Sequence, residues 1–123
     1  YDCVSPDLIH STPERALNMI KKHPKLKVIL AHLGANMMWE QVRDVLAGVD
    51  GEVYFDTAFT SMCPDELMQA IVEKHGADRI LFASDCPRDS SYLIKEKILR
   101  LNISEDNKEK ILGGNAERLL GLK

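Results

Sequence analysis

Long apolar runs are missing from this 123-residue sequence, and no stretch approaches the ~20 apolar residues that a membrane-spanning helix needs. A basic stripe is missing too, because 16 Lys and Arg are interspersed with 19 Asp and Glu, for a formal net charge of −3. Neither a membrane nor a nucleic acid is therefore expected as a partner. The sequence also shows no charged and then apolar leader of the secretory type, so we expect a cytoplasmic protein.

Paired cysteines and the common nucleotide and hydrolase motifs are absent as well. Cys3, Cys63 and Cys86 stand far apart without a Cys-x-x-Cys spacing, which argues against a zinc knuckle or a dithiol redox site and favours reduced thiols. No segment matches a P-loop, a G-x-G-x-x-G turn or a G-x-S-x-G elbow. These absences argue against a nucleotide-binding protein and against a serine hydrolase.

The sequence does contain a repeated unit, in which a short apolar run is followed by a helical pattern. The apolar runs cover residues 27–31, 53–58 and 79–83, so they begin 26 residues apart each time. None alternates cleanly between apolar and polar residues, which is typical of parallel strands buried on both faces. Helical spacing occupies residues 11–23, 38–48, 64–76, 91–101, 104–114 and 115–122. The pattern predicts an α/β fold of parallel βα units in one segment, residues 1–123.

Polar side chains follow the predicted strands at the point where each strand ends. The first run closes on His32, the second carries Asp56 and Thr57, and the third closes on Ser84 and Asp85. In parallel α/β folds, binding and catalytic groups lie at the carboxyl ends of the strands. If the three strands are neighbours, these polar groups converge on one rim of the sheet.

The titratable groups at this rim each have a functional and a structural interpretation. His32 is a metal ligand, a general acid or base, or an imidazole bonded to a backbone carbonyl. Asp85 either serves a site, where a buried carboxylate needs a cation or hydrogen bonds, or caps the next turn. Asp56 either forms hydrogen bonds within the rim or orients a neighbouring group.

Other polar and aromatic residues are expected to have mainly structural roles. His10 is expected on an exposed loop, and Trp39 in helix packing. His75 ends a helical segment, where a charged imidazolium would interact with the negative end of the helix dipole. Asn115 is expected to cap the last helix, and residues 88–89 either shape the mouth of a pocket or pair in solvent.

Four segments together resemble the amidohydrolase superfamily, in the amidohydrolase-related branch that includes decarboxylases and small-acid hydrolases. They are HPKLKVILAHLGAN, VYFDTAF, HGADRILFASDCP and KILGGNAERLLGL. The resemblance implies a (β/α)8 TIM barrel in which residues 27–32, 53–57 and 80–84 are strands six, seven and eight. It also implies a divalent metal, with zinc the expected ion, at the carboxyl rim.

The resemblance further implies roles for two residues. Asp85 is similar to the strand-eight aspartate, which touches the metal and takes a proton from its bound water. His32 is similar to the strand-six histidine, which activates that water, polarises the substrate, or binds metal in two-metal relatives. Both are therefore candidate catalytic residues and candidate metal ligands. The implied activity is that of a metal-dependent hydrolase or decarboxylase acting on a small carboxylate, ester, lactone or amide.

The family pattern is incomplete in this chain. Its His-x-His on strand one and its strand-five histidine have no counterpart, and the chain starts at Tyr1 without a methionine. We therefore expect the carboxyl-terminal part of a longer barrel, inactive by itself. Its open edges favour self-association into a homo-oligomer. The alternative is a non-catalytic α/β module for binding or structure.

Overall fold

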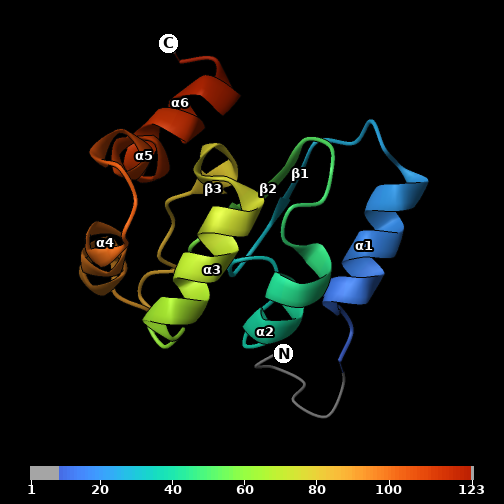
Figure 1. The fold of residues 1–123 in the computed structure, drawn as a ribbon, viewed down its shortest axis with the longest axis horizontal. Coiled ribbons are helices and arrows are strands. Elements are labelled where there is room, and N and C mark those ends of the chain that lie inside the picture. The colour runs from blue at the N-terminus through green and yellow to red at the C-terminus, as the bar shows by residue number, and fades with distance from the viewer. Residues whose placement is uncertain (1–8, 123) are drawn as a thin grey trace.

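Three parallel strands form the centre of the protein (Figure 1). The computed structural model describes residues 9–122. Its elements, in chain order, are α1 (Pro13–Lys22), β1 (Val28–Leu30), α2 (Trp39–Gln41), η1 (Val42–Leu46), β2 (Val53–Asp56), α3 (Asp65–His75), η2 (Ala77–Arg79), β3 (Ile80–Leu81), α4 (Ser91–Arg100), α5 (Glu105–Glu109), η3 (Lys110–Gly114) and α6 (Asn115–Leu120). Among these residues, no helix is both long and apolar enough to cross a bilayer.

The strand order is β1-β2-β3, so strands that follow one another in the chain are also neighbours in the sheet. Val28 pairs with Val53 in parallel register, and Phe55 pairs with Leu30 on one side and Ile80 on the other. The prediction of parallel βα units is confirmed. Parallel pairing brings the three carboxyl ends to the same edge of the sheet, where binding groups of such folds lie.

The helices bury one face of the sheet. Val53, Phe55 and Ile80 are each at most 1% exposed and belong to the main apolar core. Side chains from η1, α3 and α4 complete that core. Figure 1 shows α3 in front of the strands, with α1 toward one side and α4 toward the other. Trp39 is 7% exposed within this core, which confirms its expected packing role.

The opposite face of the sheet is partly open. Ile29 and its register partner Tyr54 share a face, but Ile29 is 50% exposed whereas Tyr54 is 8% exposed. The expectation that every strand is buried on both faces is therefore wrong for β1. The physical reason is position: β1 is an edge strand of the described sheet, and Ile29 lines an open cavity.

The strands are shorter than predicted at their carboxyl ends, most clearly in β3. Residues 79–83 were expected to form a strand, but the ladder stops after Leu81. The N–H of Ala83 donates to Oγ1 of Thr57 (3.0 Å), and the same hydroxyl donates to the Ala83 carbonyl (2.9 Å). A side chain thus takes the place of a backbone partner and ends the ladder.

Two helical regions contain a wider π-helical turn. The predicted helix at 38–48 is a short α2 followed by η1, where the N–H of Ala47 bonds to the carbonyl of Val42 (2.7 Å). The second π-helical segment, η3, joins α5 to α6. There the Ile111 carbonyl accepts from the N–H of Phe82 (3.0 Å), so η3 supports the chain directly after β3.

His75, predicted to be a charged group at a helix end, is buried and neutral. Its ring stacks on Phe55 with centroids 3.8 Å apart, and the residue is 1% exposed. The Gly48 N–H donates to Nδ1 (3.2 Å), so Nε2 carries the hydrogen and donates to the Val53 carbonyl (2.9 Å). Burial, aided by the positive charge of Arg79, lowers the pKa of His75 to about 4. The structural role was predicted, but the charge was wrong.

Asn115 does not cap the last helix, contrary to prediction. Its side chain is fully buried, and its Nδ2 donates to the carbonyls of Ala77 (2.7 Å) and Ile80 (2.8 Å). The preceding residue, Gly114, already has helical dihedrals because α6 continues directly from η3. Asn115 therefore ties the η3–α6 junction to η2 and β3 instead of starting a helix.

Candidate functional site

Each strand leads into a turn that contains a residue with left-handed backbone conformation. His32 (φ 61°) follows β1, Phe59 (φ 55°) follows β2, and Asp85 (φ 62°) follows β3. Residues other than glycine adopt such angles rarely, at a cost of roughly 1–3 kcal/mol each. Strain of this kind persists where surrounding contacts fix the chain, and it is concentrated at functional sites. Backbone strain therefore marks the turns that carry both candidate site residues.

A cavity of about 450 Å³ opens at this edge of the sheet. This volume lies within the ~300–1,000 Å³ that is usual for small-molecule sites. The residues on its wall include His10, Ile29, Leu30, His32, Phe59, Asp85 and Arg88. The structure thus brings His32 and Asp85 into one cavity, whereas Asp56, Thr57 and Ser84 do not line it.

The turn after β1 is shaped by a close approach between the chain and η1. Gly34 has φ 96°, and a Cβ there would lie 2.9 Å from Cγ1 of Val42. The indole Nε1 of Trp39 donates to the His32 carbonyl (3.0 Å). A glycine is therefore required at position 34, and the packed indole helps to hold the strained residue at position 32.

The imidazole of His32 is held by one of its two nitrogens. Nδ1 lies 3.1 Å from the Ala58 carbonyl oxygen, and the ring meets Phe59 edge-on with centroids 6.2 Å apart. Because a carbonyl oxygen can only accept, Nδ1 carries the hydrogen, and the neutral ring keeps its lone pair on Nε2. The predicted backbone-bonded imidazole is therefore observed, and this bond leaves Nε2 able to act as a ligand or a base.

Asp85 lies at the exposed mouth of the cavity. The argument that its burial requires a cation is not supported, because Asp85 is exposed within residues 9–122. The backbone N–H groups that a capping carboxylate would bind have other acceptors. The Arg88 N–H donates to the backbone carbonyl of Asp85 (2.8 Å), and the Cys86 N–H donates to the Ser84 hydroxyl (3.3 Å). In the described part of the chain, the Asp85 carboxylate therefore has no capping role.

His10 is a cavity residue that sequence reasoning did not identify as part of the site. It is exposed, as predicted, and it lines the same cavity as His32 and Asp85. The guanidinium of Arg15 in α1 donates to the carbonyls of Ile9 (3.0 Å) and His10 (2.8 Å), which fixes this segment. No local pattern signals this placement, because it depends on how α1 lies against the sheet.

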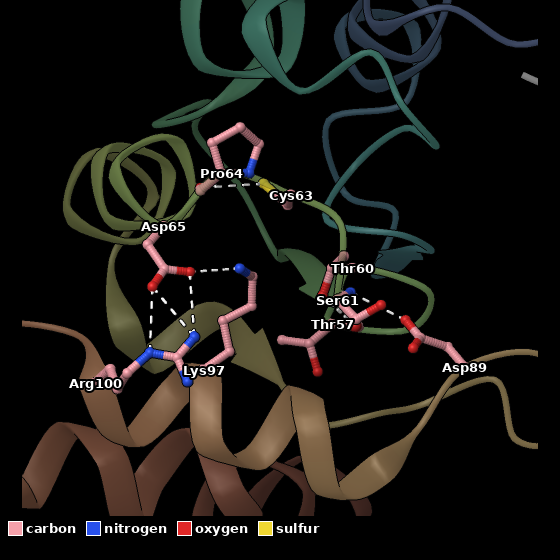
Figure 2. Close-up of polar contacts among 9 residues, drawn as sticks. All are labelled: Thr57, Thr60, Ser61, Cys63, Pro64, Asp65, Asp89, Lys97 and Arg100. Atoms are coloured by element: carbon pink, nitrogen blue, oxygen red, sulfur yellow. Dashed lines mark hydrogen bonds and ion pairs between the residues drawn. The ribbon is translucent and has the colours of Figure 1, made fainter.

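A network of polar contacts connects the loop after β2 with the loop after β3, and α3 with α4 (Figure 2). The Asp89 carboxylate accepts from the Ser61 N–H (3.0 Å). Lys97, which is 5% exposed, donates to Asp65 (2.5 Å), and Arg100 bonds the same carboxylate (3.2 Å). The hydrogen bond from Lys97 holds the pKa of Asp65 below its usual value. The bond between Ser61 and Asp89 holds the loop that follows Asp85, and the bonds to Asp65 join α4 to α3; none of these residues lines the cavity.

The thiol that neighbours this network is not a nucleophile. Cys63 is 1% exposed, and burial raises the pKa of its thiol to about 12. A thiol with this pKa stays protonated at neutral pH, and the thiolate is the reactive form. Cysteine chemistry is therefore not supported at Cys63.

The residues at this cavity supply only part of the ligand set that a metal ion needs. His32 and Asp85 offer one imidazole and one carboxylate to the same cavity. Within residues 9–122, no group of three His, Cys, Asp or Glu side chains is arranged to hold a metal. Catalytic zinc normally takes three protein ligands. The described residues can therefore contribute two ligands, and a complete site would need others.

Comparisons with known proteins agree on the family. The model of the family described as amidohydrolase matches residues 4–122. A gamma-resorcylate decarboxylase from Polaromonas is 28% identical over 131 residues, covering 93% of this chain and 40% of that protein. The crystal structure of a 2,6-dihydroxybenzoate decarboxylase from Rhizobium aligns with a TM-score of 0.66 at 25% identity, over 90% of this chain and 41% of that one.

A third relative supports the fold alone. The structure of a dihydroxybenzoic acid decarboxylase from Polaromonas, determined with bound manganese and the inhibitor 2-nitroresorcinol, has a TM-score of 0.61 at 22% identity, over 85% of this chain and 36% of that one. The chain spans about two fifths of the length of the relatives it matches. The predicted fold class, α/β units of a partial TIM barrel, is confirmed. This chain belongs to the amidohydrolase family, and the relatives named above are decarboxylases.

Proposed function

We propose that the protein to which residues 1–123 belong is a metal-dependent decarboxylase of small, hydroxylated aromatic carboxylates. The observation that carries this proposal is that His32 and Asp85, on strained turns after the two outer strands β1 and β3 of the parallel sheet, line one cavity of small-molecule size. The relatives' names, gamma-resorcylate and 2,6-dihydroxybenzoate decarboxylase, suggest the substrate class. Hydrolysis of a small ester, lactone or amide is the second chemistry that the same pair of groups supports.

The chemistry required of this chain is proton transfer beside a bound substrate. In decarboxylation the bond between the ring carbon and the carboxylate carbon breaks, CO2 leaves, and a proton takes its place on the ring carbon. The carboxyl group of Asp85 and Nε2 of His32 are two groups at the cavity that can hold and deliver such a proton. Arg88 adds positive charge to the wall, which suits an anionic substrate, and Phe59 and Ile29 add apolar surface.

A divalent metal is the proposed cofactor, with Asp85 as a ligand from this chain. Nε2 of His32 is a second ligand only where it does not carry the proton, because one nitrogen lone pair cannot do both. When bound, it would act as a Lewis acid on a substrate oxygen or on water. Zinc remains the proposed ion on the family resemblance, and manganese, present in one relative's structure, is its competitor. Metal analysis of the purified protein distinguishes the two.

The remaining ligands are proposed to come from barrel strands outside the described residues. Residues 1–123 would then be the carboxyl-terminal part of the barrel, inactive when produced alone. The half-exposed Ile29 and the open edge of β1 would favour association with a second copy. Sedimentation of the isolated 123-residue chain should show species larger than a monomer; a stable, compact monomer would contradict this expectation.

The test of function uses the complete polypeptide that contains this chain. Loss of a hydroxybenzoate substrate and release of CO2 are measured for the wild type, Asp85→Asn and a matched control, Asp50→Asn, at an exposed aspartate before β2. We expect Asp85→Asn to abolish turnover and lower the metal content, and Asp50→Asn to change neither. A metal-free protein, or full turnover in Asp85→Asn, would contradict the proposal and favour the non-catalytic module.

A further inference from the structure

Asp56 and Thr57 occupy consecutive positions at the end of the central strand β2, and each contacts the turn of a different neighbouring strand. Asp56 reaches the turn after β1, and Thr57 reaches the chain after β3. Neither lines the cavity, so a role for either residue must act through the groups that it holds.

Asp56 determines the position of His32 through two hydrogen bonds to one oxygen. Its Oδ1 accepts from the backbone N–H of His32 (2.9 Å) and from that of Ala58 (3.0 Å). The carbonyl of Ala58 is in turn the partner of His32 Nδ1. The Asp56 carboxylate therefore fixes both the strained backbone under His32 and the carbonyl that determines its tautomer. Bonds to an ionised acceptor are about twice as strong as neutral ones.

Thr57 holds the chain just before Asp85. Its hydroxyl donates to the Ala83 carbonyl and accepts from the Ala83 N–H, and the residue is 1% exposed. The next contact between these loops is the Phe59 N–H on the Ser84 carbonyl (3.3 Å). Two successive contacts therefore tie the loop after β2 to the residues that lead into the left-handed turn at Asp85.

We infer that Asp56 and Thr57 are positioning residues at the end of β2, with Asp56 orienting His32 on the β1 side and Thr57 orienting Asp85 on the β3 side. The inference rests on the proposed function, in which these two groups act together at the cavity. Both turns are strained, so removal of the bonds that hold them would let the backbone relax and displace the side chain. Partners of this kind typically contribute ~10- to 100-fold in metal affinity or activity.

The experiment compares variants of the complete polypeptide. Asp56→Ala and Thr57→Val remove the hydrogen bonds, whereas Thr57→Ser keeps the hydroxyl and Asp56→Asn keeps an uncharged acceptor. The control is Thr60→Val: the Thr60 hydroxyl is fully buried in the same loop and donates to the Thr57 carbonyl (2.6 Å), and within residues 9–122 it bonds to neither neighbouring turn. Melting temperature, kcat, KM and the Kd for Zn²⁺ and Mn²⁺ are measured for each variant.

We expect Asp56→Ala and Thr57→Val each to lower kcat and weaken metal binding by ~10- to 100-fold, with KM changing less. Thr57→Ser should recover most of the loss, Asp56→Asn should be intermediate, and Thr60→Val should lower only the melting temperature. If the alanine and valine variants do not fold, the intermediate loss in Asp56→Asn carries the test.

Wild-type kcat and metal affinity in Asp56→Asn, Asp56→Ala and Thr57→Val, while Asp85→Asn abolishes turnover, would overturn the inference and leave the proposed function intact. Full turnover in Asp85→Asn would overturn the proposed function and the inference with it.

Discussion

Two histidines lie near opposite ends of the central strand β2, and their surroundings distinguish a structural from a functional histidine. His75 lies near the start of β2, where both ring nitrogens bond to the backbone and the ring stacks on Phe55. His32 lies beyond the other end, half-buried at the cavity, where only Nδ1 has a partner within residues 9–122. Both rings use a backbone carbonyl, yet only one retains a nitrogen for a ligand.

The difference teaches what a carbonyl contact means for a histidine. A ring with both nitrogens bonded to the protein is a packing element, and its burial keeps it neutral. A ring bonded through one nitrogen is oriented, and its second nitrogen is available to a metal, a proton or a substrate. The carbonyl contact that looked like a structural alternative for His32 is therefore also what a functional histidine requires.

In the comparison of the two histidines, the largest expected effect is on turnover in His32→Ala. Removing the group that carries a proton in the reaction should lower kcat/KM of the complete polypeptide by ~100-fold or more. The melting temperature should change little, because His32 is only half-buried. Steady-state kinetics and a thermal unfolding curve test both statements. A large loss of stability with unchanged turnover in His32→Ala would contradict this prediction, because His32 would then be a structural residue like His75.

The second effect is on stability in His75→Ala. This change leaves a cavity beside Phe55 and removes the partners of the Gly48 N–H and the Val53 carbonyl. The free energy of unfolding should fall by about 3 kcal/mol. Urea denaturation measures it, and kcat of the remaining folded protein should stay near the wild-type value. An effect below about 1 kcal/mol would mean that the ring is not packed as described.

The pH dependence of stability should follow from the same ring. The pKa of His75 is about 4 in the fold, against 6.5 for an ordinary histidine, so the unfolded chain binds the proton first. The stability that the neutral ring provides is present above about pH 6.5 and is lost as pH falls through 4, by up to about 3 kcal/mol. In His75→Phe, urea curves between pH 7 and 4 should show a smaller decline; an identical decline would assign the effect to other groups.

The smallest expected effect is in the polar network behind the site. Lys97→Met should change the free energy of unfolding by about 1 kcal/mol or less, because its partner Asp65 is partly exposed and keeps Arg100. Asp65→Ala should cost more, since it leaves a buried ammonium without its partner. Denaturation curves of both variants test this order. If Lys97→Met lowered the free energy of unfolding more than Asp65→Ala, the Lys97 ammonium would stabilise the fold through more than its contact with Asp65.

Much of the fold could be predicted because the relevant signals are local. Continuous apolar runs before His32, Asp56 and Asp85 indicate parallel strands, and parallel pairing brings their ends to one edge. The placement of His32 and Asp85 at one edge of the sheet follows from that topology, whereas it does not determine which of the groups at this edge line the cavity. The sequence therefore carried the two features on which the candidate site depends.

The remaining features depend on contacts between distant residues. A histidine at a helix end looks the same in sequence whether it is exposed or, like His75, stacked under a strand. The short β3 results from the hydroxyl of Thr57, which is 26 residues away from Ala83. His10 reaches the cavity only through the docking of α1. Such placements are tertiary and leave no local pattern.

The central claim is that Asp85 and His32 serve one metal-dependent site. The most direct measurement is a crystal structure of the complete polypeptide grown with Zn²⁺ or Mn²⁺ and recorded at the metal's absorption edge. The account predicts an anomalous peak about 2.2 Å from an Asp85 carboxylate oxygen, in the cavity that His32 lines. A metal bound elsewhere, with neither residue in its surroundings, would contradict it.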